Sequence, residues 1–132
     1  MKDVQVIVLA AGEGKRMGDP TLPKALVELS GKPLISYLLE SIKFSGVDQT
    51  PIIVVGHLAQ KVKETLGPSY TYVFQNERLG TGHAVMSAKE AAAGRAKNVM
   101  VLYADTPLIT PASIRRIAEK QIWDDAVLTM AT

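Results

Sequence analysis

The sequence contains no cysteine, which excludes disulfide bonds, zinc–thiolate centres and thiol nucleophiles. Aromatic residues make up only 5% of the 132 residues, and the net charge is only +2. A nucleic-acid-binding protein typically shows a basic stripe interleaved with aromatic side chains, and this chain has none. We therefore expect no nucleic-acid partner, whereas local cations remain available for a small phosphorylated ligand.

Long apolar runs are also missing. The N-terminal run, residues 6–11, is too short for the hydrophobic region of a signal peptide. No stretch approaches the roughly 20 apolar residues of a membrane span. The remaining composition, 47% hydrophobic and 21% charged, is that of an ordinary globular chain of one-domain length. We expect a cytoplasmic protein without a membrane partner.

Short β-branched runs alternate with amphipathic segments along the chain. Residues 10–32 are rich in glycine and proline, which predicts a long loop, and Pro33 fits the first turn of the helix that follows. The alternation predicts a Rossmann-like, doubly wound α/β fold, with helices on both faces of a mostly parallel sheet. The expected strands are residues 4–9, 52–55, 70–74, 99–103 and 126–130, and the expected helices are residues 33–45, 57–66, 82–93 and 111–121.

The chain stops at Thr132, immediately after the last expected strand. No helix or edge element closes the predicted sheet, so we interpret residues 1–132 as the N-terminal, nucleotide-binding part of a larger domain, or as an abbreviated relative of one. An unfinished sheet edge would favour pairing with another chain, and a homo-oligomer could form in this way.

The first candidate phosphate site is the glycine-rich segment that follows the first strand, residues 9–17. It fails the dinucleotide fingerprint because Met17 stands at the third glycine position, and the chain contains no P-loop string. What remains is a turn whose backbone amides can form an anion nest, with Lys15, Arg16 and, further on, Lys24 as cations. Arg16 can clamp two oxygens, whereas Lys24 is a mobile point charge. The alternative is a surface loop with solvated cations.

Two further segments follow the ends of expected strands. In residues 75–82, the Gln75 amide can both donate and accept at the edge of a base, and Gly80 would let a base lie against the backbone. The alternative is that Thr81 is a helix cap and the glycines shape a turn. Asp105 ends an apolar strand, where a carboxylate suits Mg²⁺, although it could instead brace the turn before Pro107.

Two histidines, His57 and His83, open expected helices, and for both a structural role at the helix end is favoured over that of a base or ligand. No Ser/His/Asp constellation can be argued from the sequence. An enzyme built from these parts would work by positioning its substrates and neutralising their charge.

Taken in order, these segments resemble the sugar-1-phosphate nucleotidyltransferases. Their signature L-x-A-G-x-G-x-R-[ML], followed by a Pro-Lys pair, is matched by residues 9–17 and 23–24. The likeness is strongest to the uridylyltransferase domain of N-acetylglucosamine-1-phosphate uridylyltransferases, the UDP-N-acetylglucosamine pyrophosphorylases. There, Leu-Gly-Thr-Gly-His-Ala follows the third strand, as at residues 79–84, and Tyr-Gly-Asp-x-Pro-Leu follows the fourth, as at residues 103–108 apart from Ala104.

The resemblance implies a Mg²⁺-dependent reaction in which a sugar-1-phosphate oxygen attacks the α-phosphorus of UTP and pyrophosphate leaves. By this likeness Arg16 and Lys24 are the catalytic cations, and Asp105 is the metal ligand. The implied nucleotide-binding residues are Leu9, Ala10, Ala11, Gly12, Gly14, Gln75, Gly80, Thr81, Tyr103 and Ala104.

Two positions depart from the close relatives. Ala104 replaces a glycine, which adds a methyl group beside the nucleotide, and Arg78 replaces a frequent glutamine near the base. The later half of the family's domain supplies most of the sugar pocket and a second metal ligand, so we expect little or no turnover from residues 1–132 alone. Two alternatives remain: a non-catalytic nucleotide-binding module, and a nucleotidyltransferase for another acceptor, such as the molybdenum cofactor.

Overall fold

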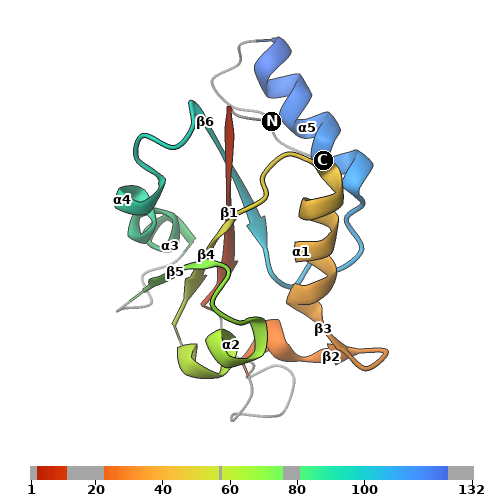
Figure 1. Cartoon of the computed structure of the whole chain (residues 1–132), viewed down its shortest axis with the longest axis vertical. Helices are drawn as coiled ribbons and strands as arrows, with labels where there is room; N and C mark the ends of the chain where they lie inside the picture. Colours follow the sequence, from red (N-terminus) through yellow and green to blue (C-terminus); the bar gives the residue numbers. More distant parts are fainter. Residues whose placement is uncertain (1–2, 12–22, 57, 76–80, 125–132) are drawn as a thin grey trace.

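Four parallel strands form the sheet at the centre of the molecule. The computed structural model describes residues 3–11, 23–56, 58–75 and 81–124. Within these ranges the strands lie in the order β5-β4-β1-β6, and all neighbouring pairs are parallel. Their bounds are Val4–Ala10 for β1, Ile52–Val55 for β4, Thr71–Phe74 for β5 and Asn98–Tyr103 for β6 (Figure 1).

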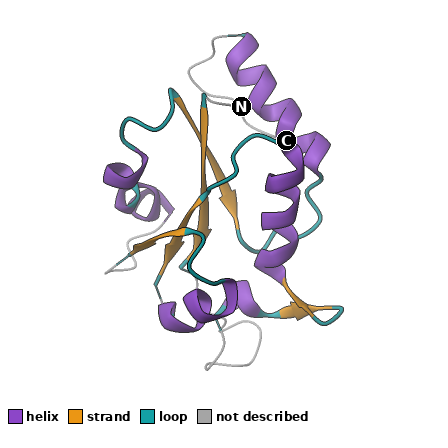
Figure 2. Ribbon diagram, viewed as in Figure 1, coloured by secondary structure: helices purple, strands orange, loops and turns teal. Residues whose placement is uncertain are grey.

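Helices cover both faces of this sheet (Figure 2). On one face, Ile35, Val62 and Ile114 bring three helices onto a single buried core. On the other face, Ala84 packs against Ile7 in a smaller core. The arrangement confirms the α/β fold with a parallel sheet between helical layers. The helices are α1 Leu34–Ser45, α2 Ala59–Leu66, α3 Thr81–Ser87, α4 Lys89–Ala92 and α5 Pro111–Trp123.

Strand β1 lies between β4 and β6 and is apolar at nearly every position because both of its faces are covered. Val6 and Val8 are fully buried in the larger core, and Ile7 between them lies in the smaller one. Successive side chains of a strand point to opposite faces, so a central parallel strand needs apolar residues on both. Each such side chain contributes roughly 1.5–3 kcal/mol by its burial.

The predicted loop over residues 10–32 contains secondary structure that its glycine and proline content did not reveal. A short 3-10 helix, η2 (Lys24–Leu26), is followed by a two-stranded hairpin of β2 (Glu28–Leu29) and β3 (Lys32–Pro33). Gly31, with φ 79°, lies in the turn of this hairpin. The interpretation of the whole segment as a loop was therefore wrong for its second half.

The start of α1 also differs from the prediction. Pro33 is the N-cap, with φ −56° and ψ 141°, and does not belong to the first turn. Its backbone stays extended because it pairs with Glu28 across the hairpin. The first helical residue, Leu34, donates its backbone N–H to the Val27 carbonyl at 2.8 Å, which fixes the helix start against the hairpin.

The expected third helix is divided in two. Ala88, with φ −90° and ψ 0°, separates α3 from α4 and is fully buried in the smaller core. A small side chain at the break lets the backbone lie close to the sheet. Among the other predicted elements, α2 begins at Ala59 and α5 ends at Trp123, whereas the strand expected at residues 126–130 lies outside the described residues.

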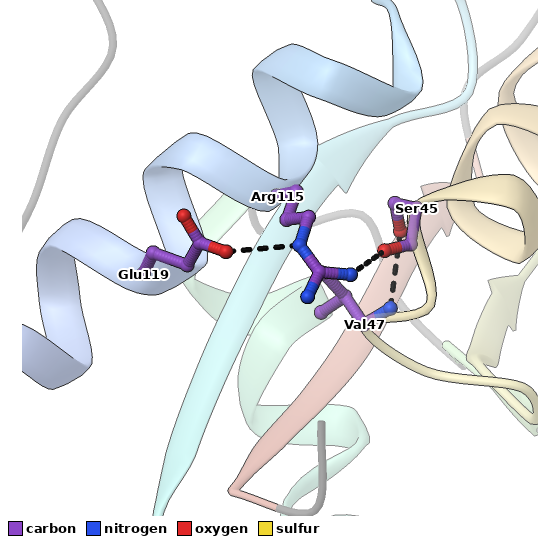
Figure 3. A network of polar contacts seen from close by, with 4 residues as sticks. All are labelled: Ser45, Val47, Arg115 and Glu119. Atoms are coloured by element: carbon purple, nitrogen blue, oxygen red, sulfur yellow. Dashed lines mark hydrogen bonds and ion pairs between the residues drawn. The ribbon is translucent and has the colours of Figure 1, made fainter.

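A polar network joins α5 to the end of α1 (Figure 3). Arg115 donates from Nη1 to the Ser45 carbonyl oxygen at 3.1 Å and from Nε to Glu119 Oε1 at 2.9 Å. The Ser45 hydroxyl accepts the backbone N–H of Val47 at 3.2 Å. The cation thus satisfies a last-turn carbonyl of α1, a position that favours positive charge. In the described part of the chain, no helix has the length and apolar character needed to cross a membrane.

Candidate active site

The order of the strands defines where a ligand would bind. The chain runs from β1 to β4 and β5 on one side, and then returns to β6 on the other side of β1. In open parallel sheets, ligands bind beyond the carboxyl ends of the strands at such a switch point. Parts of two of the predicted segments lie there: residues 9–11 span the carboxyl end of β1, and residues 103–105 span the carboxyl end of β6.

The two strand ends are held together by backbone contacts. Leu9 is the register partner of Tyr103, and the Ala104 N–H donates to the Leu9 carbonyl at 3.1 Å. Ala10, Ala11 and Ala104 are buried, whereas Tyr103 is 48% exposed. The buried residues at both strand ends are thus alanines, whose small side chains leave the backbone of the two segments close together.

Gly56, directly after β4, lies close to the switch point, and the sequence patterns did not single it out. A Cβ at this position would lie 3.1 Å from the Ala11 Cβ and 3.3 Å from the Ala11 carbonyl oxygen. Strand β4 therefore approaches the start of the glycine-rich segment at a distance that only glycine permits without displacement. The signal in the sequence was a glycine directly after an apolar strand, at a position where a predicted parallel sheet must meet its loops.

Lys24 and Asp105, predicted from separate motifs, form an ion pair. The Lys24 Nζ lies 2.7 Å from Asp105 Oδ2, and the two side chains are 34% and 37% exposed. Lys24 is the first residue of η2, and its neighbours Ala25 and Leu26 are buried in the larger core. The 3-10 helix thereby fixes the backbone from which the ammonium group reaches across to the end of β6.

The turn after β6 is braced by Thr106. Its backbone N–H and its hydroxyl both donate to the Tyr103 carbonyl, at 3.2 and 2.7 Å. The Asp105 carboxylate faces the Lys24 ammonium group.

A carboxylate at the carboxyl end of a parallel strand is a suitable ligand for Mg²⁺, which takes one or two carboxylates and completes its shell with water and substrate phosphates. Within the described ranges, no three His, Cys, Asp or Glu residues gather as a metal-binding group. Among the described residues, Asp105 could hold a metal only together with ligands from elsewhere, such as substrate phosphates or water.

Gln75 follows β5 and thus also lies beyond the carboxyl ends of the parallel strands. Its backbone N–H donates to the Val55 carbonyl at 2.8 Å, and the residue is only 7% exposed. Its Nε2 lies 3.0 Å from Nδ1 of His83, which lies in α3. His83, for which a structural role was favoured, thus contacts the residue predicted to read the base.

Several predicted site residues lie outside the part of the chain that the structure describes. They include the catalytic candidate Arg16, and no side-chain position is described for Thr81, whose backbone begins α3. The others are Gly12, Gly14, Lys15, His57, Arg78 and Gly80. Their roles remain predictions.

The switch-point site and the parallel α/β sheet are those of a nucleotide-binding transferase domain. The chain belongs to the family of MobA-like NTP transferase domains, which it matches over residues 6–132. It is 45% identical over 114 residues to the bifunctional protein GlmU of Acetivibrio thermocellus. The match covers 86% of this chain and 24% of that protein, so the chain spans about a quarter of the relative's length.

Solved structures share the fold. A nucleotidyl transferase from Methanothermobacter thermautotroptrophicus superposes with a TM-score of 0.71 at 29% identity, covering 90% of this chain and 58% of that one. A UDP-glucose pyrophosphorylase complexed with UDP-glucose superposes with a TM-score of 0.77 at 23% identity, covering 96% and 55%. The family match and the relative that is 45% identical confirm the resemblance to nucleotidyltransferases stated from the motifs.

Proposed function

We propose that this chain forms the nucleotide-binding part of a Mg²⁺-dependent enzyme that transfers a uridylyl group from UTP to a sugar-1-phosphate. N-acetylglucosamine-1-phosphate is the acceptor that the motifs favour. The observation that carries the proposal is the convergence of Lys24 and Asp105 at the switch point between β1 and β6. A cation for phosphates and a carboxylate for a metal are the two charges that this reaction requires.

The reaction is a displacement at phosphorus. An oxygen of the sugar-1-phosphate forms a bond to the α-phosphorus of UTP, the bond to the bridging oxygen of the β-phosphate breaks, and pyrophosphate leaves with that electron pair. When bound, Mg²⁺ would supply a Lewis acid for the phosphate oxygens. Lys24 would neutralise charge on the phosphates, and Asp105 would hold the metal.

The remaining parts of the site would bind the nucleoside. The buried Gln75 amide would read the base, and the backbone of Leu9, Ala10 and Ala11 would lie along the nucleotide, with the exposed Tyr103 ring and Ala104 beside it. Arg16, from the segment outside the described residues, would add a second cation for the triphosphate. Fixed charges and amides aimed at a transferring phosphoryl group are typically the largest contribution to catalysis of this kind.

The cellular setting belongs to the same proposal. A cytoplasmic enzyme would meet UTP and sugar phosphates directly. Among the described strands, β5 and β6 are at the sheet edges, and pairing of an edge with a second copy would give a homo-oligomer. Light scattering on the full-length protein would measure that state.

The test is pyrophosphate release by the full-length protein with UTP, N-acetylglucosamine-1-phosphate and Mg²⁺. We expect turnover that requires all three, and that falls by about 10²-fold or more in Asp105→Asn. Tight Mg²⁺-dependent UTP binding without turnover on any sugar-1-phosphate would support a binding module instead. Turnover with GTP and a molybdenum-cofactor acceptor would place the chain with the guanylyltransferases.

A further inference from the structure

The contact between Lys24 and Asp105 joins a single ammonium group to a single carboxylate. Lys24 Nζ lies 2.7 Å from Asp105 Oδ2, and about a third of each side chain is exposed. In the described part of the chain, neither residue has another ion pair or side-chain hydrogen bond. The carboxylate therefore has one negative charge to offer, and the ammonium group of Lys24 already uses it.

Both residues are anchored at the backbone, so an exchange of partners can involve side chains alone. Leu26 of η2 is buried, and its N–H donates to the Pro23 carbonyl at 2.9 Å. The turn that carries Asp105 is held by the two hydrogen bonds of Thr106. A lysine carries its charge on a flexible four-carbon stem. The ammonium group of Lys24 can therefore leave Asp105 while η2 stays in place.

A divalent cation and the ammonium group would compete for the same carboxylate. Mg²⁺ binds carboxylate oxygens at about 2.0–2.1 Å, so a metal on Asp105 would lie beside the Lys24 ammonium group. Like charges this close repel each other strongly. Within the described ranges, Lys24 pairs with no second carboxylate that could balance the added charge. The two cations therefore exclude each other at Asp105 until further negative charge arrives.

We propose that Lys24 makes metal binding at Asp105 depend on phosphate. The phosphates of a nucleotide carry several negative charges and give the ammonium group a new partner, which leaves the carboxylate to the metal. Metal and phosphate then favour each other's binding, because the ion pair has to be broken only once for both. The inference rests on the proposed function, in which Asp105 holds a divalent cation.

The first test is Mn²⁺ binding to the full-length protein, followed by spin resonance. Without phosphate, Lys24→Met should bind Mn²⁺ about two- to fivefold more tightly than the wild type, which is the range expected for an ion pair of this exposure. Inorganic pyrophosphate should tighten Mn²⁺ binding in both proteins, after allowance for the Mn²⁺ that pyrophosphate binds in solution. The gain should be about two- to fivefold smaller in Lys24→Met, which has no ion pair to break.

Two further variants separate exchange from a general effect of charge. Lys24→Arg keeps a cation within reach of Asp105 and should bind Mn²⁺ as the wild type does. Lys32→Met is the matched control, because Lys32 is 32% exposed and pairs with Glu40, so the variant loses the same charge from a comparable ion pair. Its Mn²⁺ affinity should equal that of the wild type. Equal tightening in Lys32→Met and Lys24→Met would overturn the proposal.

The exchange can also be followed in the wild type, through the nitrogen-15 resonance of the Lys24 ammonium group. Its absence from Lys24→Arg assigns this resonance. Mg²⁺ should shift it saturably over the concentrations at which Mg²⁺ displaces Mn²⁺ from the protein. A Lys24 resonance that stays unchanged over that range would show that metal and ammonium group do not compete, and it would overturn the proposal.

None of these measurements requires turnover. If the protein transfers no nucleotide but shows the exchange, the proposed function fails and the exchange stands. If it turns over UTP while the wild type and a folded Lys24→Met bind Mn²⁺ equally, the exchange fails alone. Mn²⁺ binding that is unaltered in Asp105→Asn would contradict both, and thermal unfolding shows whether each variant is folded.

Discussion

Replacing Asp105 with asparagine should affect catalysis far more than folding. The substitution keeps the shape of the side chain and removes one negative charge from the ion pair with Lys24, whose atoms lie 2.7 Å apart. Both side chains are about a third exposed, so solvent screens the pair, and pairs of this kind contribute about 0.2–1 kcal/mol. For a domain of this size, the melting temperature should fall by about 4 °C or less.

The effect on turnover should be larger. Loss of one group that stabilises the transferring phosphoryl charge typically costs about 10²–10³ in rate, or roughly 3–4 kcal/mol of barrier. The assay pairs pyrophosphate release with thermal unfolding followed by circular dichroism. Glu119→Gln is the matched control, because it makes the same chemical change in the exposed pair of Arg115 and Glu119, whose closest atoms lie 2.9 Å apart on α5. It should cost equally little stability and leave turnover unchanged.

Two results would refute this reasoning. If Asp105→Asn retained turnover within about threefold of wild type, the carboxylate would not hold the metal or any reacting charge. If its melting temperature fell by roughly 10 °C or more, the ion pair would be a structural support, and its loss of activity would have no catalytic meaning.

Three further predictions follow from single contacts. Lys24→Met should lower turnover by about 10²-fold. In spin-resonance titrations without nucleotide, this variant should bind Mn²⁺ up to about fivefold more tightly, because the ammonium group no longer competes for Asp105. Weaker Mn²⁺ binding would contradict this. Gly56→Ala should lower the free energy of unfolding in urea by about 1 kcal/mol and raise KM for UTP by displacing Ala11. An unchanged KM would show that the close approach of Gly56 to Ala11 does not shape the site. Burial and, secondarily, Tyr70 raise the pKa of Tyr72, so the folded state favours the neutral phenol and loses stability as pH rises above the ordinary value of 10.0. Tyr72→Phe should reduce that loss of stability at alkaline pH. An unaltered profile of stability against pH would argue against this role of Tyr72.

The sheet could be predicted because the apolar pattern of a strand shows which of its faces are buried. A run such as that of β1 is apolar on both faces, which is what a central parallel strand requires. The chain order of strands and helices then implies a switch point, and with it the convergence of residues 9–11 and residues 103–105. Those predictions depend on local patterns and on general rules of topology.

The contacts within the site could not be predicted in the same way. The ion pair of Lys24 with Asp105 depends on η2, which is placed by burial of Ala25 and Leu26 in the larger core and by its contacts with α1. The contact of His83 with Gln75 depends on how α3 packs on the sheet, and a histidine near the start of a helix is usually structural. Such pairings are tertiary, and no spacing within the chain encodes them.

The segment from Lys24 to Pro33 shows the same limit at the level of secondary structure. Glycine and proline indicated a loop, but two short strands pair within it and set Pro33 as the cap of α1. A two-residue strand has too few positions for any alternation to be visible in the sequence.

The most direct test of the central claim is to map where UTP binds in the presence of Mg²⁺, by amide chemical-shift changes in the full-length protein. The site described above predicts that the largest changes fall on residues 9–11, Lys24, Gln75 and residues 103–105, and that they weaken in Asp105→Asn. Changes centred on another face of the sheet, or no saturable change at any concentration of Mg²⁺ and UTP, would contradict the assignment of a nucleotide site to the switch point between β1 and β6.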